Sequence, residues 1–131
     1  MIVDSSALIA ILKDEPGAEA LRDIVIGADQ SGMSAATLVE IGMVVEGQRG
    51  EAGAAELDLL LAELQIEIVP FDADQAALAR EAFQRFGKGR HPAGLNFGDC
   101  LAYALAKHLG EPLLFTGNDF ARTDLTPVLP A

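Results

Sequence analysis

The sequence predicts an α/β layer structure with a mainly parallel central sheet. Short apolar runs at residues 1–3, 66–69 and 113–116 are too brief for helices and are typical of buried strands. Longer segments between them carry apolar residues at helical spacing, as in residues 54–65, where leucines fall on one face. Strand-like and helix-like segments therefore alternate along the chain, which is the order that parallel strands with helical crossovers require.

Each expected element has local signals at its ends. Serine, aspartate and asparagine cap helix N-termini, proline favours the first helical turn, and glycine ends helices. The expected elements are a strand at 1–3, a helix at 7–13 capped by Ser5 or Ser6, a helix from Pro16 to about 28, a strand at 32–34, a helix at 36–48 ended by the QRG turn, a helix at 54–65, a strand at 66–69, a helix from the Asp72 cap to Phe86, a helix at 97–109 capped by Asn96 and ended by Gly110, a strand at 113–116, a turn or short helix at 118–122, and a strand at 126–129.

Composition places the chain among globular proteins. Its 131 residues fit one domain spanning 1–131, half of them are hydrophobic, and the mean hydropathy of +0.28 excludes a disordered chain. No apolar run is long enough to span a membrane, and Asp4 interrupts the first one, unlike a signal peptide. We therefore expect a cytoplasmic protein without membrane contact. The single cysteine, Cys100, excludes an internal disulfide and a cysteine-rich zinc site.

The chain is strongly acidic. Nine Lys and Arg residues against twenty Asp and Glu residues give a net charge of −11. That balance alone argues against nucleic-acid binding, which normally depends on neutralising phosphates. It is compatible with a site that holds divalent cations, because the bound ions reverse the local sign of the charge.

Four acids stand in segments that are otherwise apolar. Asp4 ends the strand MIV, Glu40 lies within TLVEIGMVV, Asp99 within LNFGDCLAYALA, and Asp119 follows LLFTGN. Carboxylates in such surroundings are rarely buried without compensation, because removing their charge from water is costly. Taken singly, Asp4 and Asp119 could be helix caps and Glu40 could point to solvent. Together the four indicate one site, because all of them stand at apolar positions and two, Asp4 and Asp119, lie just past strands, where sites form in parallel sheets.

Three kinds of compensation are conceivable for these acids. The sequence offers no nearby basic partner, since no Lys or Arg lies within a helical turn of Glu40 or Asp99. Helix capping would serve Asp119 and partly Asp4, but we expect Glu40 and Asp99 to lie beyond the first turn of their helices. A shared divalent cation would serve all four, and ligands that are all oxygen select Mg²⁺ or Mn²⁺.

The same segments resemble the PIN-domain ribonucleases, and most closely the VapC type, the toxin component of bacterial toxin–antitoxin pairs. The resemblance is carried by MIVDSSALIAIL, by VE in an apolar helix, by LNFGDCLAYALA and by LLFTGNDFARTDL. It implies a three-layer α/β/α sandwich and a Mg²⁺-dependent endoribonuclease that acts as the toxin of a type II pair. It also implies RNA as substrate, a cognate antitoxin as inhibitor, and a homodimer that forms a heterotetramer or larger assembly with the antitoxin.

By this resemblance, Asp4, Glu40, Asp99 and Asp119 form the catalytic quartet. Asp4 and Asp99 would bind the metal directly, with Glu40 and Asp119 acting through water or at a second metal. The resemblance also places Ser6, Asn96 and Thr116 beside the quartet, and Asp124 at a further acidic position of undefined role.

The loop before the Asp99 helix is the remaining candidate for substrate contact. It gathers Arg85, Lys88, Arg90 and His91 next to two glycines. The cations either contact RNA phosphates or form an ordinary solvated loop, and the sequence favours neither.

Other function classes fit less well. A phosphatase of the haloacid-dehalogenase type needs a second Asp where this chain has Ser6, a receiver domain needs a lysine after Lys107, and a dinucleotide-binding turn needs glycines that DSSA lacks. A metal-dependent phosphatase-like activity remains the enzymatic alternative. A non-catalytic acidic module that binds a basic partner also remains open.

Overall fold

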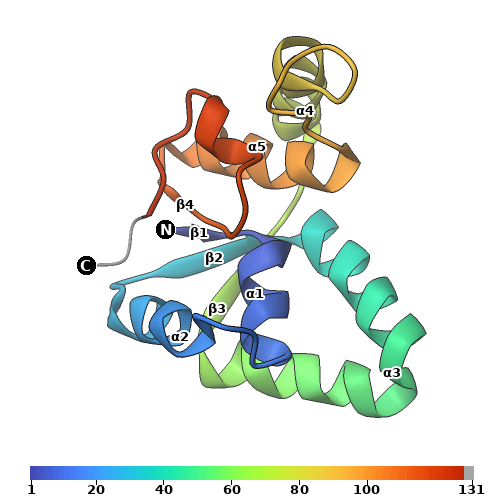
Figure 1. Ribbon diagram of the computed structural model, residues 1–131, viewed down its shortest axis with the longest axis vertical. Coiled ribbons are helices and arrows are strands. Elements are labelled where there is room, and N and C mark those ends of the chain that lie inside the picture. Colours follow the sequence, from blue (N-terminus) through green and yellow to red (C-terminus); the bar gives the residue numbers. More distant parts are fainter. Residues whose placement is uncertain (129–131) are drawn as a thin grey trace.

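Four short parallel strands form the central sheet of the computed structural model, which describes residues 1–128 (Figure 1). The sheet order is β3-β2-β1-β4, and every pairing is parallel. The strands are β1 (Ile2–Val3), β2 (Ser31–Ser34), β3 (Ile66–Val69) and β4 (Leu113–Leu114). The predicted mainly parallel sheet is therefore confirmed, with β1 in its interior between β2 and β4.

Helices cover both faces of this sheet, so the three-layer α/β/α sandwich is also confirmed (Figure 1). One face carries α1 (Ser5–Leu12), α2 (Ala18–Gly27) and α3 (Ala35–Glu63), and the other carries α4 (Ala73–Phe86) and α5 (Phe97–Leu109). Successive strand residues point to opposite faces. Val3 and Leu114 accordingly pack with the first group of helices, while Ile2 and Leu113 pack with the second.

Several helix ends differ from the expected ones. Asp4 caps α1 in place of Ser5 or Ser6, because its carboxylate accepts the Ser6 backbone N–H at 3.0 Å. The helix expected from Pro16 begins at Ala18, after Gly17 has taken the left-handed conformation (φ 91°). For α5 both predictions are confirmed: Asn96 caps it, and Gly110 ends it in the left-handed region (φ 66°).

The two helices expected at 36–48 and 54–65 are joined into α3. The chain breaks helical geometry at Gly50 (φ 63°, ψ −152°), within the predicted QRG turn, and resumes helix at once. The joint turns the second half of α3 back toward the sheet, so that Leu57, Leu60 and Leu61 reach the same core as Ile41 from the first half.

The C-terminal part of the sheet is shorter than expected. Strand β4 covers two residues of the predicted 113–116. Of the strand predicted at 126–129, the described residues form one parallel bridge between Leu113 and Pro127, while Leu129 lies outside them. Proline has no backbone N–H to donate, so the ladder is limited to the bonds on either side of it. Within residues 1–128, no helix has the length and apolar character needed to cross a membrane.

Candidate active site

Asp4 is a buried carboxylate at the carboxyl end of the central strand β1. The residue is 2% exposed, and its backbone N–H donates to the Leu114 carbonyl at 2.9 Å. Burial raises the pKa of Asp4 above its ordinary value, while hydrogen bonds from Ser6 and Ser5 oppose the shift and the charge of Asp119 adds to it. Hydrogen bonds therefore tie Asp4 to β4 and to α1, while burial disfavours its charged form.

Asp99 lies in the first turn of α5. The expectation that it lies beyond the first turn is therefore wrong. It forms a reciprocal capping box with Asn96: the Asp99 N–H donates to Asn96 Oδ1 at 2.9 Å, and the Asn96 N–H donates to Asp99 Oδ2 at 3.1 Å. Burial, opposed by the bond from Asn96 and supported by the charges of Asp4 and Asp119, raises the pKa of Asp99 to about 7. The cap explains the orientation of this carboxylate but does not neutralise it.

Glu40 reaches the site from α3, in the segment that follows β2. Its carboxylate rests against Gly98 of α5, and a Cβ at that position would overlap both carboxylate oxygens. Burial, and secondly the charge of Asp4, raises the pKa of Glu40. Glu40 therefore turns inward and does not point to solvent, and Gly98 leaves the space that it needs. Gly98 was missed in the sequence analysis, because the contact joins residues far apart in the chain.

Asp119 is the exposed member of the quartet. It precedes the short 3-10 helix η1 (Phe120–Arg122), but its side chain makes no capping hydrogen bond, so the expected cap role is wrong. Its charge acts on both Asp4 and Asp99. A hydrogen bond from the Thr116 N–H to Ser6 Oγ, 3.1 Å long, ties the segment between β4 and Asp119 to the start of α1.

The structure thus brings the four acids together at the carboxyl edge of the sheet, from four separate segments. Within residues 1–128, none of the four forms an ion pair with Lys, Arg or His. In the same described part of the chain, no three carboxylate, imidazole or thiol groups are arranged so that they could jointly hold a metal ion as they stand. The quartet is a concentration of unbalanced negative charge, the kind of environment typical of functional sites.

The comparison with known proteins supplies the family. The profile of the PIN domain matches residues 1–125. The chain belongs to the PIN-domain family. It is 52% identical over 128 residues to Ribonuclease VapC of Mycolicibacterium smegmatis, with 98% of this chain and 99% of that protein covered. The predicted resemblance to VapC-type PIN domains is therefore confirmed.

Solved structures of lower sequence identity share the fold. The crystal structure of VapC20 from Mycobacterium tuberculosis, titled a sarcin-ricin loop cleaving toxin, has a TM-score of 0.78 at 17% identity and covers 98% of each chain. A toxin–antitoxin complex from Klebsiella pneumoniae has a TM-score of 0.70 at 18% identity, covering 99% of this chain and 97% of that one. At these identities the likeness concerns the PIN fold itself.

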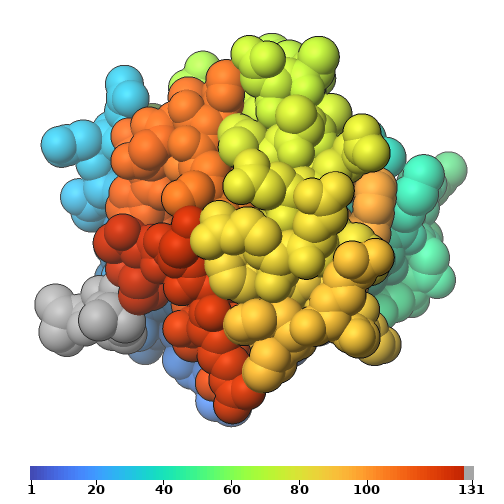
Figure 2. All heavy atoms as spheres, turned by 90° about the horizontal axis from the view of Figure 1, so that it is seen from above, coloured from blue at the N-terminus to red at the C-terminus, as the bar shows by residue number. Residues whose placement is uncertain are grey.

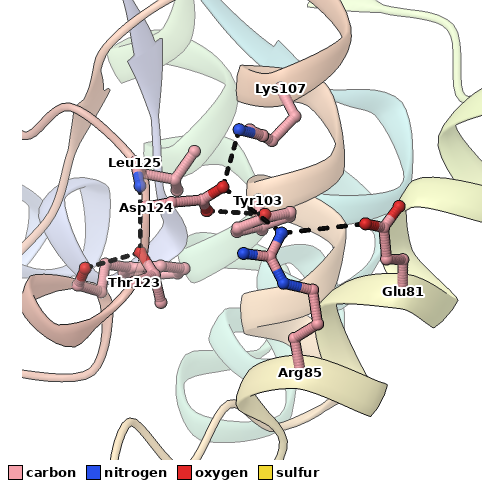
Figure 3. A network of polar contacts seen from close by, with 8 residues as sticks. Glu81, Arg85, Tyr103, Lys107, Thr123, Asp124 and Leu125 are labelled. Carbon is pink, nitrogen blue, oxygen red and sulfur yellow. Dashed lines mark hydrogen bonds and ion pairs between the residues drawn. The ribbon is translucent and has the colours of Figure 1, made fainter.

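Asp124 of this PIN domain lies in a separate polar network on α4 and α5 (Figure 3). It accepts the Tyr103 hydroxyl at 2.7 Å and Lys107 Nζ at 2.8 Å, and Arg85 lies 3.4 Å from it and 3.7 Å from Glu81. Burial alone would raise the pKa of Asp124. The pKa nevertheless lies below its ordinary value, because Lys107 and Tyr103 donate hydrogen bonds to the carboxylate and the charges of Lys107 and Arg85 stabilise its ionised form. Asp124 therefore anchors the C-terminal segment of the PIN domain to α4 and α5.

The basic loop of the PIN domain is partly engaged in local contacts. His91 packs edge-on against Phe86 with ring centres 5.2 Å apart, and its Nδ1 accepts the Ala93 N–H at 3.0 Å. The Arg90 guanidinium lies 5.2 Å from the centre of the Phe83 ring. With Arg85 held by carboxylates, Arg90 is the better placed of the two predicted arginines for contact with a substrate, and that role stays a prediction.

Proposed function

We propose that this PIN-domain protein is a divalent-metal-dependent endoribonuclease, with Mg²⁺ or Mn²⁺ as its ion, and the toxin of a type II toxin–antitoxin pair. One observation carries the proposal: Asp4, Glu40 and Asp99 are desolvated, have raised pKa values, and lack a cationic partner within residues 1–128. Evolutionary kinship supports the RNA substrate, since a protein named Ribonuclease VapC shares 52% of the residues.

The donor set fits a hard divalent cation. All four side chains offer oxygen, and Mg²⁺ usually keeps several waters while binding one or two carboxylates and the substrate phosphate. This coordination preference agrees with a quartet in which, among the described residues, no three acids are already arranged to ligate one ion. We assign direct contact to Asp4 and Asp99, the two carboxylates that backbone hydrogen bonds hold in place, and contact through water to Glu40 and Asp119.

A bound divalent cation would polarise the phosphodiester and lower the pKa of an attacking water. The chain itself supplies positioning. The Asn96 cap orients Asp99, the Ser6 backbone N–H orients Asp4, and the Ser6 hydroxyl holds the segment that leads to Asp119 through Thr116. These contacts fix the acids before substrate arrives, which is the property that electrostatic catalysis requires.

A protein partner is part of the proposal. The Klebsiella pneumoniae structure is titled a toxin–antitoxin complex, and we propose that a cognate antitoxin likewise binds this chain, in a homodimer-based heterotetramer or larger assembly. Val39 and Met43, 57% and 72% exposed, flank Glu40 on α3 and offer apolar surface to such a partner. A basic antitoxin side chain entering the quartet would block metal or substrate, so the purified complex should cleave RNA more slowly than the free protein. The proposed setting of these events is the cytoplasm.

RNA cleavage by matched variants tests the proposal. The wild type, Asp4→Asn and Asp99→Asn are incubated with labelled total RNA in Mg²⁺, in Mn²⁺ and in EDTA. Asp58→Asn serves as the control, because Asp58 on α3 is exposed and forms no ion pair within residues 1–128. We expect cleavage by the wild type and the control in metal only, and loss of at least about a hundredfold in both site variants. Cleavage that survives EDTA or both substitutions would show that the acids are not a catalytic metal site.

A further inference from the structure

A pocket of about 480 Å³ lies between α4 and the first turns of α5. Its walls come from α4, from the loop that follows, and from the start of α5. Figure 2 shows α4 and this loop on the outer face, with the orange start of α5 emerging between α4 and α3. The volume falls in the range of pockets that hold small organic ligands.

Two aromatic rings that are partly exposed to solvent line the pocket. Phe97, the first residue of α5, is 76% exposed, and Phe83 on α4 is 40% exposed. Arg90 stacks its guanidinium on the Phe83 ring, 5.2 Å from the ring centre. Two rings and a planar cation around one hollow form a stacking surface, the arrangement by which proteins hold unpaired bases.

The charge around the pocket is opposite to that of the chain. Arg80 and Arg90 line it, and Lys88 lies in the adjoining loop. In the part of the chain that the structure describes, these three form no ion pair, whereas Arg85 between them is paired with Glu81 and Asp124. In a protein with a net charge of −11, such a group of uncompensated cations indicates an anionic ligand.

The pocket also adjoins the acidic quartet. Phe97 and Cys100 line it, and the two residues between them are Gly98, which contacts Glu40, and Asp99. Phe97 and Asp99 belong to the same first turn of α5 but point in different directions, because residues two positions apart on a helix do not share a face. A nucleotide chain would therefore cross the N-terminus of α5 between the pocket and the carboxylates. Single-stranded RNA combines exposed bases with phosphates, which matches a pocket that offers aromatic rings beside arginines.

We propose that the pocket holds one unpaired base of the RNA, stacked against Phe97 beside the scissile phosphodiester, with Arg80 and Arg90 contacting the flanking phosphates. The inference rests on the proposed ribonuclease function and adds to it a subsite that favours single-stranded RNA. The base gains affinity by stacking, which depends little on its identity, so the subsite selects unpaired nucleotides and not one sequence.

Binding of two short fluorescent RNAs tests the subsite. One carries bases throughout, the other has the same length with abasic sites at its centre, and both are titrated in EDTA so that neither is cleaved. For Phe97→Ala we expect Kd for the base-bearing RNA to rise about tenfold, with Kd for the abasic RNA changed by less than about twofold. Leu59→Ala, which removes a 71% exposed apolar side chain from α3, should leave both values unchanged. Arg90→Gln should weaken both RNAs alike.

Three other outcomes would contradict either the base subsite or the proposed ribonuclease function. If Phe97→Ala weakens both RNAs equally, or neither, the pocket does not bind a base. If it instead converts a dimer to a monomer in light scattering while RNA affinity stays the same, the pocket is a contact between copies. If the wild type cleaves no RNA in Mg²⁺ or Mn²⁺, the proposed ribonuclease function is contradicted. If the wild type cleaves RNA but Phe97→Ala does not distinguish base-bearing from abasic RNA, only the proposed base subsite is contradicted.

Discussion

Replacing Asp99 by asparagine should stabilise the metal-free protein at alkaline pH. The pKa of Asp99 in the fold is about 7, against an ordinary value of 3.8, because burial and the charges of Asp4 and Asp119 oppose its ionisation. A carboxyl whose pKa is raised on folding binds its proton more tightly in the folded state. Its contribution to stability is therefore most favourable below the unfolded pKa, declines as the pH rises toward 7, and is unfavourable above that.

The size of the effect follows from the two pKa values. A difference of about 3 units between 7 and 3.8, at about 1.36 kcal/mol each, sets an upper limit near 4 kcal/mol. Solvent reaches the half-buried Asp99 and screens its neighbours, so we expect about half of this, near 2 kcal/mol. Asparagine carries no charge, and its amide oxygen can still accept the Asn96 N–H, so the cap of α5 persists. For a chain of this size the gain corresponds to a rise in Tm of roughly 8 °C.

Urea unfolding in EDTA, followed by circular dichroism, measures the effect. The free energy of unfolding of Asp99→Asn should exceed that of the wild type by about 2 kcal/mol at about pH 8, and the advantage should shrink toward zero as the pH falls to about 4. Asp58→Asn, at an exposed site on α3, should show no such pH-dependent gain. A variant no more stable than the wild type at the higher pH would refute the electrostatic reasoning.

Three further predictions concern activity and packing. RNA cleavage at limiting Mg²⁺ should rise with pH and reach half of its maximum near pH 7, because the carboxyl with a pKa of about 7 must lose its proton to bind the ion; a profile that is flat across this range would contradict it. Gly98→Ala should lower cleavage at least about tenfold, because the new Cβ displaces the carboxylate end of Glu40. Its Tm should stay the same or rise slightly, because alanine favours helix more than glycine does. Gly47→Ala, at a helical site with open space around it, is the control and should keep full activity. Tyr103→Phe should cost about 1.5 kcal/mol in urea unfolding, because it removes the hydroxyl bonded to the Asp124 carboxylate; an unchanged free energy would show that the network does not anchor the C-terminal segment.

The four acids could be predicted from sequence because the signal is local. Asp4 directly follows an apolar strand, and Glu40 and Asp99 interrupt apolar helices, so each position is anomalous before any contact is known. The parallel order of strands places Asp4 and Asp119, each of which follows a strand, at one edge of the sheet, whereas Glu40 and Asp99 were grouped with them by their apolar surroundings and by the family resemblance. The structure confirms the convergence, whereas the metal and the catalytic roles remain proposals.

Local geometry near helix ends accounts for what the sequence analysis got wrong at the site. Asp99 was expected beyond the first turn, although the helix predicted at 97–109 with Asn96 as its cap already places Asp99 in the first turn, at the spacing of a capping box. The contact of Gly98 with Glu40 joins α5 to α3 and leaves no trace in either segment alone.

For the fold too, features with a local sequence signal were predicted, and features that depend on backbone geometry were not. Apolar periodicity located the strands and helices, but not how the two halves of α3 join, because Gly50 allows a break without a loop. The C-terminal strand was predicted from its apolar residues, and Pro127 limits its described part to a single bridge with Leu113. Backbone hydrogen bonding, which hydrophobicity does not report, decides such cases.

Direct binding of Mn²⁺, followed by the electron paramagnetic resonance signal of the free ion, tests most sharply whether the quartet is a metal site. The measurement needs no RNA, so it is independent of the unknown target sequence. We predict that the wild type and Asp58→Asn remove the free-ion signal at equal protein concentrations, and that Asp4→Asn and Asp99→Asn each leave most of it in solution. Equal Mn²⁺ binding by all four proteins would contradict the assignment of the quartet as a metal site.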